Sequence, residues 1–203
     1  MGSRMRVSSH PAYFSLPGLI QKIDEPFRSS CMRILTENAV LFSNTPAAIH
    51  NHQTWNGGYL DHLQEIMNLA IVLYDSLASL RPLPFSLSDA LMVLFLHDIE
   101  KPWKYELDSK GALQIKESMR GHAAQEAFWR KMLPEYGVVF TPEQENAMVY
   151  VEGENAQYAP GRRTQGPLAA FCHLCDTTSA RIWFEYPLAK QDPWIGADRN
   201  NPE

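Results

Sequence analysis

The chain has 203 residues, of which 45% are hydrophobic and 20% are charged, and its formal net charge is -5. This length and composition suit one globular domain and exclude a disordered chain. The negative charge argues against a broad basic surface for long nucleic acid, although it is compatible with a local phosphate pocket. Three cysteines, an odd number, indicate a reducing compartment rather than a disulfide scaffold.

We expect a soluble, cytoplasmic protein without membrane contact. No stretch is apolar enough for a spanning helix, and the N-terminus lacks the charged-then-apolar order of a signal peptide. The chain divides into a loop and helix over residues 1–48, a core domain over 49–186, and a tail over 187–203. The tail is rich in Pro, Asp and Asn, and we expect it to be loosely ordered.

Hydrophobic periodicity and capping residues predict an all-α fold. Ser86 or Ser88 can cap one helix, while Thr141 and Gln144 form a capping-box pattern at another. No segment shows convincing β-alternation. The predicted helices cover about Pro26–Leu41, Tyr59–Leu80, a segment from about Ser86 to Leu96, Glu117–Met132, a segment from Thr141 to about Val151, and a last one that begins at Pro167.

The most informative stretch is the apolar run 91–96, which ends abruptly in His97 and Asp98, with Lys101 three residues later. An unpaired charge that is taken out of water is costly. A divalent metal bound by imidazole and carboxylate would compensate Asp98. The alternative is that His97 and Asp98 cap the helix end in contact with water.

Two other helices carry an ionisable residue on an apolar face. His62 begins the inward stripe of the predicted helix 59–80, and Asp176 lies on the stripe of the last helix. Taken alone, His62 is interpreted as a hydrogen-bonded core histidine, and Asp176 as a pocket carboxylate. Together with His97 and Asp98 they predict a metal site, because two imidazoles and two carboxylates suit Mn, Fe, Co, Ni or Zn, with Mg as a further candidate.

Three motifs in this order resemble the HD superfamily of metal-dependent phosphohydrolases. They are Gly57-Gly58-Tyr59-Leu60-Asp61-His62, Leu96-His97-Asp98-Ile99-Glu100-Lys101 and His173-Leu174-Cys175-Asp176. Within this superfamily, the chain is most similar to the HD domains of 3′-5′ exoribonucleases. The resemblance covers roughly residues 49–182.

The resemblance implies an HD-type helical bundle with its metal site between central helices. His62, His97, Asp98 and Asp176 would be the ligands, and Lys101 would reach a substrate phosphate. His52 also matches the family and would contact substrate, the alternative being that it only forms a hydrogen bond with the Gly-Gly loop. One ion is expected and a second can be accommodated, with His122 as a ligand. A histidine pair that the family places near residues 152–154 is missing here, so that either Glu152 or Glu154 supplies a carboxylate instead, or the second metal is weak or absent.

Other charged residues are candidates for roles around this site. Arg120, Arg162 and Arg163 could hold phosphate oxygens, although for Arg162 and Arg163 a solvated loop is an equal alternative. Glu100 replaces the usual glycine of the family motif, and its carboxylate either positions a water or faces solvent.

The sequence therefore predicts a metal-dependent phosphohydrolase that acts on a nucleotide or another small phosphorylated molecule, with Asp98, Lys101 and Glu100 as catalytic residues. A 3′-5′ exonuclease acting on short single-stranded nucleic acid is one alternative, but the roughly 50 residues before the motifs are too few and too helical for an OB barrel. A di-iron oxygenase of the HD type is another, and the missing histidine pair counts against it. A catalytically silent, nucleotide-binding HD domain is the third.

Overall fold

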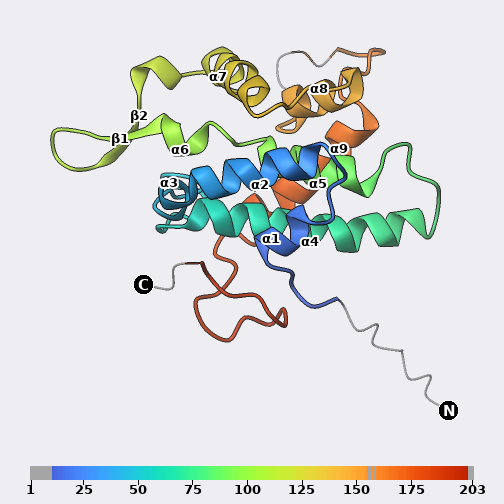
Figure 1. Cartoon of the computed structure of the whole chain (residues 1–203), viewed down its shortest axis with the longest axis horizontal. Helices are drawn as coiled ribbons and strands as arrows, with labels where there is room; N and C mark the ends of the chain where they lie inside the picture. Colours follow the sequence, from blue (N-terminus) through green and yellow to red (C-terminus); the bar gives the residue numbers. More distant parts are fainter. Residues whose placement is uncertain (1–10, 155–156, 158, 201–203) are drawn as a thin grey trace.

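The computed structural model describes residues 11–154, 157 and 159–200, and they are mostly helical (Figure 1). The helices are α1 (Leu16–Ile20), α2 (Phe27–Glu37), α3 (Ala39–Ser43), α4 (Gly58–Ala78), α5 (Leu87–Leu96), α6 (Lys101–Lys104), α7 (His122–Glu135), α8 (Pro142–Tyr150) and α9 (Pro167–Thr177). A short 3-10 turn, η1 (Glu117–Met119), precedes α7, and a π-helical turn, η3 (Thr178–Ile182), follows α9.

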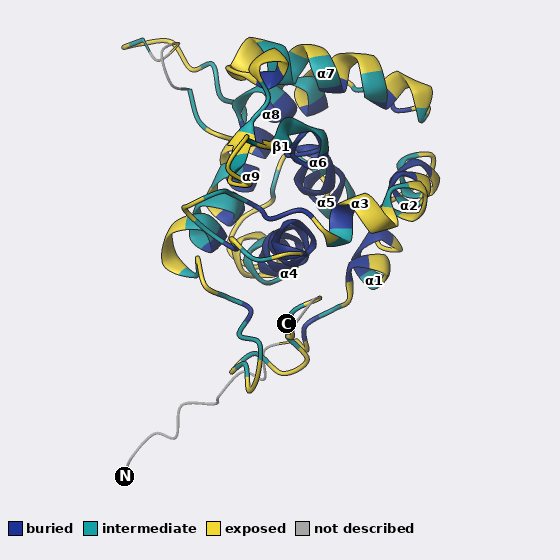
Figure 2. Cartoon of the chain, turned by 90° about the vertical axis from the view of Figure 1, so that its left-hand side faces the viewer, coloured by how far each residue is buried: buried dark blue, intermediate teal, exposed yellow. Residues whose placement is uncertain are grey.

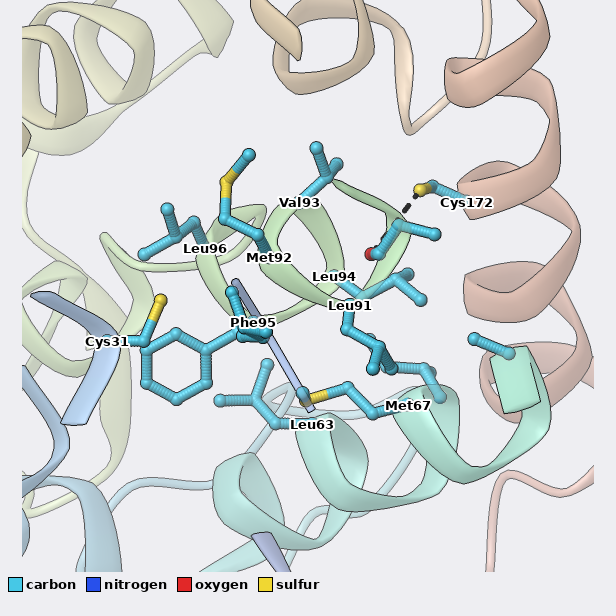
Figure 3. Close-up of a cluster of buried hydrophobic side chains, with 14 of the residues drawn as sticks. Cys31, Leu63, Met67, Leu91, Met92, Val93, Leu94, Phe95, Leu96 and Cys172 are labelled. Atoms are coloured by element: carbon cyan, nitrogen blue, oxygen red, sulfur yellow. Dashed lines mark hydrogen bonds between the residues drawn. The ribbon is translucent and has the colours of Figure 1, made fainter. Parts of the chain in front are cut away.

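Helix α5 forms the centre of the hydrophobic core. Every residue from Ala90 to Leu96 is fully buried, as expected for a helix that is apolar all round. Figure 3 shows this helix enclosed by Cys31 of α2, Leu63 and Met67 of α4, and Cys172 of α9. The first fourteen residues of α4 are also buried, and Figure 2 shows these buried parts of α4 and α5 in dark blue. The core thus places the C-terminal end of α5 deep inside the protein.

The predicted capping residues begin their helices as expected. Ser86 accepts a hydrogen bond from the amide of Asp89 at 3.0 Å at the start of α5. At the start of α8, the amide of Thr141 donates to Gln144 at 2.9 Å, and Thr141 accepts from the amide of Gln144 at 3.3 Å. These reciprocal bonds satisfy amide groups that have no partner inside the helix.

Three element predictions were wrong. The helix expected from Glu117 begins only at His122 as α7, because Arg120 is extended and separates α7 from the turn η1. The helix expected from Pro26 to Leu41 is broken at Asn38, whose side-chain amide donates to the carbonyl of Ile34 at 2.9 Å and separates α2 from α3. The region after α6 contains an antiparallel hairpin of β1 (Tyr105–Leu107) and β2 (Leu113–Ile115). Strands of three residues are too short to show the alternation that reveals longer ones.

Residues 187–200 of the C-terminal tail are packed against α4 and the N-terminal segment, which corrects the expectation of loose order for this part of the tail. The backbone amide of Tyr13 donates to the carbonyl of Ile195 at 2.9 Å, and the indole of Trp194 donates to Pro11 at 2.9 Å. Asn200 donates to a carboxylate oxygen of Asp61 from both its backbone and its side chain, at 2.8 and 2.6 Å. Figure 1 shows the N-terminal segment and the tail on the same side of the bundle.

Within residues 11–154, 157 and 159–200, no helix is both long and apolar enough to cross a membrane.

A buried carboxylate on α4 makes the stability of this fold depend on pH. Tyr13 donates a hydrogen bond to Glu65 at 2.8 Å, and burial, assisted by Asp192 and Asp61, raises the pKa of Glu65 from 4.5 to about 7. The folded state therefore holds this proton more tightly than the unfolded chain does. The resulting stabilisation is complete below pH 4.5 and is lost as the pH rises to about 7.

We predict that Glu65→Gln makes the free energy of unfolding less dependent on pH. The raised pKa of Glu65 corresponds to a change of about 3 kcal/mol in the free energy of unfolding. The variant should therefore gain stability relative to wild type as the pH rises from 4.5 to 7. Urea unfolding at a series of pH values measures the difference. If the free energies of unfolding of variant and wild type differ by the same amount at every pH in this range, Glu65 is not the group responsible for the pH dependence.

Candidate metal centre

The turn between α5 and α6 carries the first part of the site. The amide of His97 donates to the carbonyl of Val93 at 2.8 Å, and the amide of Lys101 donates to the carbonyl of Asp98 at 3.0 Å. The backbone therefore continues in helical turns from α5 to α6. His97 is 8% exposed, Asp98 3% and Lys101 8%. A solvated helix end is therefore the wrong interpretation of this His-Asp pair.

The Gly57-Gly58 pair lets the preceding loop return to the start of α4, where His62 is fully buried. Gly57 has a φ of +82°, a conformation that favours glycine. A Cβ atom on Gly58 would lie 2.0 Å from the carbonyl oxygen of Gln53, which excludes any side chain there. The pair thus fixes the loop 49–57 against the first turns of α4.

Asp176, near the end of α9, completes a cluster drawn from three regions of the chain. Its Oδ1 lies 3.1 Å from His62 Nε2 and 3.7 Å from His97 Nε2. Asp98 Oδ2 lies 3.1 Å from His97 Nε2 and 3.7 Å from His62 Nε2. The ligand atoms of His62, His97 and Asp176 all lie within 4.8 Å of one another. The structure thus brings together the four residues that the sequence singled out.

Both imidazoles present Nε2 to the carboxylates. His97 Nδ1 lies 2.8 Å from the carbonyl oxygen of Leu94, which can only accept, so Nδ1 is the donor. His62 Nδ1 lies 3.3 Å from Ser179 Oγ. The Nε2 atoms are buried and have no hydrogen-bond partner among the described residues. Unpartnered buried nitrogens facing carboxylates fit a divalent cation, because imidazole nitrogen and carboxylate oxygen are common ligands of such ions.

The charges in the cluster compensate one another. Lys101 Nζ lies 2.5 Å from Asp98 Oδ2. Burial by itself raises the pKa of Asp98, but His97 and Lys101 outweigh it and hold this pKa well below its usual range. Conversely, burial lowers the pKa of His97, but Asp98 and Asp176 outweigh it and raise this pKa. The two aspartates therefore require nearby positive charge, which a divalent cation would also supply.

His52 lies beside the cluster, as the resemblance implied. Its ring centroid is 4.8 Å from that of His62, and its Nδ1 lies 2.6 Å from the side-chain oxygen of Gln53. Burial, together with the positive charge of His62 and Lys101, lowers the pKa of His52 to about 4. At neutral pH this imidazole is therefore uncharged.

Sequence reasoning missed the roles of two residues that hold this arrangement. Gln53 is fully buried, and its side-chain amide donates to Ser179 Oγ at 3.1 Å and to the carbonyl of Tyr186 at 2.9 Å. Ser179 in turn contacts His62 Nδ1. The helical pattern of the sequence does place Ser179, three residues after Asp176, on the same face as this ligand, but it gives Ser179 no role. Nothing in the sequence distinguishes Gln53 from an ordinary loop residue.

The structure does not bring all predicted residues to the centre. Among the described residues, the convergent ligand group consists of His62, His97 and Asp176, so His122 and Glu154 are not part of it. The side chain of His122 is 51% exposed at the start of α7, 3.8 Å from Glu126. Glu154 accepts hydrogen bonds from the amides of Thr164 and Gln165 at 2.9 and 2.8 Å, and its carboxylate thus orders a loop.

The candidate phosphate-binding arginines lie on the surface. Arg120 is exposed and paired with Glu117 at 3.0 Å, and Arg162 and Arg163 are exposed in the loop before α9. Glu100, in contrast, is only 4% exposed, so the interpretation that its carboxylate faces solvent was wrong. Burial, followed by the charge of Asp98, raises the pKa of Glu100.

Comparisons of this chain with protein-family models, with curated proteins and with solved structures find no match.

We predict that the cluster binds a divalent cation in the folded protein. Mn²⁺ at about 100 times its dissociation constant should raise the free energy of unfolding by about 2.7 kcal/mol. Asp176→Asn should remove this effect, because it takes a charged oxygen from the convergent group. The exposed Asp75→Asn, also on a helix, serves as the matched control. Thermal unfolding with and without Mn²⁺ checks the prediction, and equal stabilisation of all three proteins would contradict it.

Proposed function

We propose that this protein is a metal-dependent phosphohydrolase of the HD type, with a helical bundle that holds one divalent cation. His62, His97, Asp98 and Asp176 would be its ligands. The observation that carries this proposal is the pair of buried, unpartnered Nε2 atoms that face two aspartates. One divalent cation bound by both Nε2 atoms and both carboxylates would satisfy all four groups at once.

A divalent cation at this position supplies charge for a phosphoryl oxygen and lowers the pKa of water toward about 7. The chain itself supplies positioning. Lys101 is buried beside the candidate ligands, and although burial opposes it, Asp98 raises its pKa, so the side chain remains a cation. An ammonium group held in this way binds a phosphate oxygen, which is the main requirement of phosphoryl transfer.

The proposed substrate is a small phosphorylated molecule such as a nucleotide. Lys101 is the basic residue that contacts the cluster, whereas Arg120, Arg162 and Arg163 are exposed. Tight binding of a polynucleotide depends on many phosphate contacts from basic side chains. The distribution of charge thus favours a substrate with few phosphates over a nucleic-acid strand.

The decisive experiment measures bound metal and phosphate release on the same samples. Wild type should bind about one equivalent of a mid-row divalent metal and release phosphate from members of a panel of phosphate esters. Asp98→Ala should lose the metal and the activity together while its circular dichroism keeps the helical signal, because Asp98 makes its contacts at the centre. Asp75→Ala, on the exposed face of α4, is the control.

Full phosphate release by Asp98→Ala would contradict the proposal. Nucleotide binding without turnover in wild type would instead support a silent HD domain. Iron-dependent oxygen consumption would support the oxygenase alternative.

We predict a different result for Lys101. Lys101→Met should keep the metal, because the ligand set is intact, but should lower kcat/KM for phosphate release by about 100-fold, since it removes the cation next to the reacting phosphate. Elemental analysis and steady-state kinetics check both parts. The exposed Lys110→Met, in the turn of the hairpin, should retain full activity, and activity of Lys101→Met within twofold of wild type would show that Lys101 does not contact the substrate.

A further inference from the structure

The loop 49–57 brings two side chains to the candidate metal centre. The ring of His52 lies 4.8 Å from that of His62, and Gln53 reaches His62 through Ser179. The loop forms neither helix nor strand, so its position depends on contacts with other segments. The contacts that hold it therefore also decide how His62 is oriented.

Trp55 fastens the second half of this loop to the start of α4. Its indole nitrogen donates a hydrogen bond to Asp61 Oδ2 at 2.7 Å. Its carbonyl oxygen accepts from the amide of Gly58 at 2.9 Å, which closes a turn with Gly57 at a φ of +82°. Asp61 directly precedes the candidate ligand His62 in the first turns of the helix. A displacement of Trp55 would therefore be felt at the centre.

Asp61 is a buried carboxylate that depends on a residue of the tail. It is 1% exposed, and its Oδ1 accepts hydrogen bonds from the backbone amide and the side-chain amide of Asn200, at 2.8 and 2.6 Å. Its place in the first turn of α4 adds a favourable interaction with the N-terminal end of the helix. Without Asn200, Oδ1 would lose both of these donors in the interior, which is costly for a charged group.

Arg199, the preceding residue of the tail, covers the face of the Trp55 indole. Its guanidinium carbon lies 3.6 Å from the centroid of the ring, a favourable arrangement of a cation on an aromatic face. The same guanidinium donates to the carbonyl of Pro187 at 3.0 Å and to that of Glu185 at 3.2 Å. Trp55 is thus held at its edge by Asp61 and on its face by Arg199.

We propose that Arg199 and Asn200 are positioning residues of the candidate metal centre. Acting on Trp55 and Asp61, they hold the loop 49–57 in the conformation that orients His62. The loop is then ordered before a metal ion or a substrate arrives, so that binding does not have to order it. The inference rests on the metal centre of the proposed function and adds to it a segment that contributes no ligand.

Hydrogen–deuterium exchange of the full chain tests the order of the loop. The amide of Gln53 is protected by its hydrogen bond to the carbonyl of Phe184 at 2.9 Å. Asn200→Asp places a second carboxylate against Asp61, so the loop should exchange at least about tenfold faster, while α5 keeps its wild-type rate. Gln191→Glu is the matched control, since it makes the same change from amide to carboxylate on an exposed side chain of the tail.

Calorimetric titration with Mn²⁺ tests the effect on the centre. The dissociation constant should rise about tenfold in Asn200→Asp and in Arg199→Ala, because contacts that orient a ligand change metal affinity by this order. Gln191→Glu and the exposed Lys190→Ala should bind Mn²⁺ like wild type.

A tail that contributes only to stability would give a different result. The melting temperatures of Asn200→Asp and Arg199→Ala would fall, but at 25 °C the exchange of the loop and the Mn²⁺ dissociation constant would stay at their wild-type values, and this outcome would overturn the inference. Absence of phosphate release from wild type would count against the proposed function alone, because neither the exchange of the loop nor the affinity for Mn²⁺ depends on turnover.

Discussion

The structure depends on the compensation of buried charge at the end of its most hydrophobic helix. Helix α5 is enclosed on all sides, and its continuation carries His97 and Asp98 into the same interior. Burying two carboxylates in a low-dielectric environment is unfavourable unless positive charge lies within a few ångströms. Asp98 and Asp176 obtain that charge from Lys101, from His97 and, in our proposal, from a cation. The hydrophobic core and the candidate site are therefore parts of one arrangement.

The second imidazole is held in place by residues that do not belong to the candidate ligand set. Gln53 connects the loop before α4 with Ser179 and with the segment after α9, and Gly58 permits the close backbone approach on which this connection depends. Ser179 then contacts His62 on the side away from the carboxylates. Such outer contacts orient a ligand and select the nitrogen that it presents.

The charge around the centre is unequal on its two sides. Lys101 provides a buried cation next to Asp98, whereas the carboxylates of Glu100, Glu126 and Glu152 lie on the side of His97 that faces α7. The acidic character of the whole chain, with a net charge of -5, agrees with a small substrate rather than a long anionic polymer.

The sequence by itself determined the helical class, the helix start at Thr141, a second start at Ser86 or Ser88, and the ionisable residues on apolar faces, because periodicity and capping are local properties of the chain. Only the tertiary structure decided that those residues converge, since the distance between Asp176 and His62 follows from the packing of α9 on α4. It also decided that Glu154 orders a loop and that Gln53 supports the centre. Each of these roles is set by contacts between segments far apart in the chain, and local sequence patterns carry no record of such contacts.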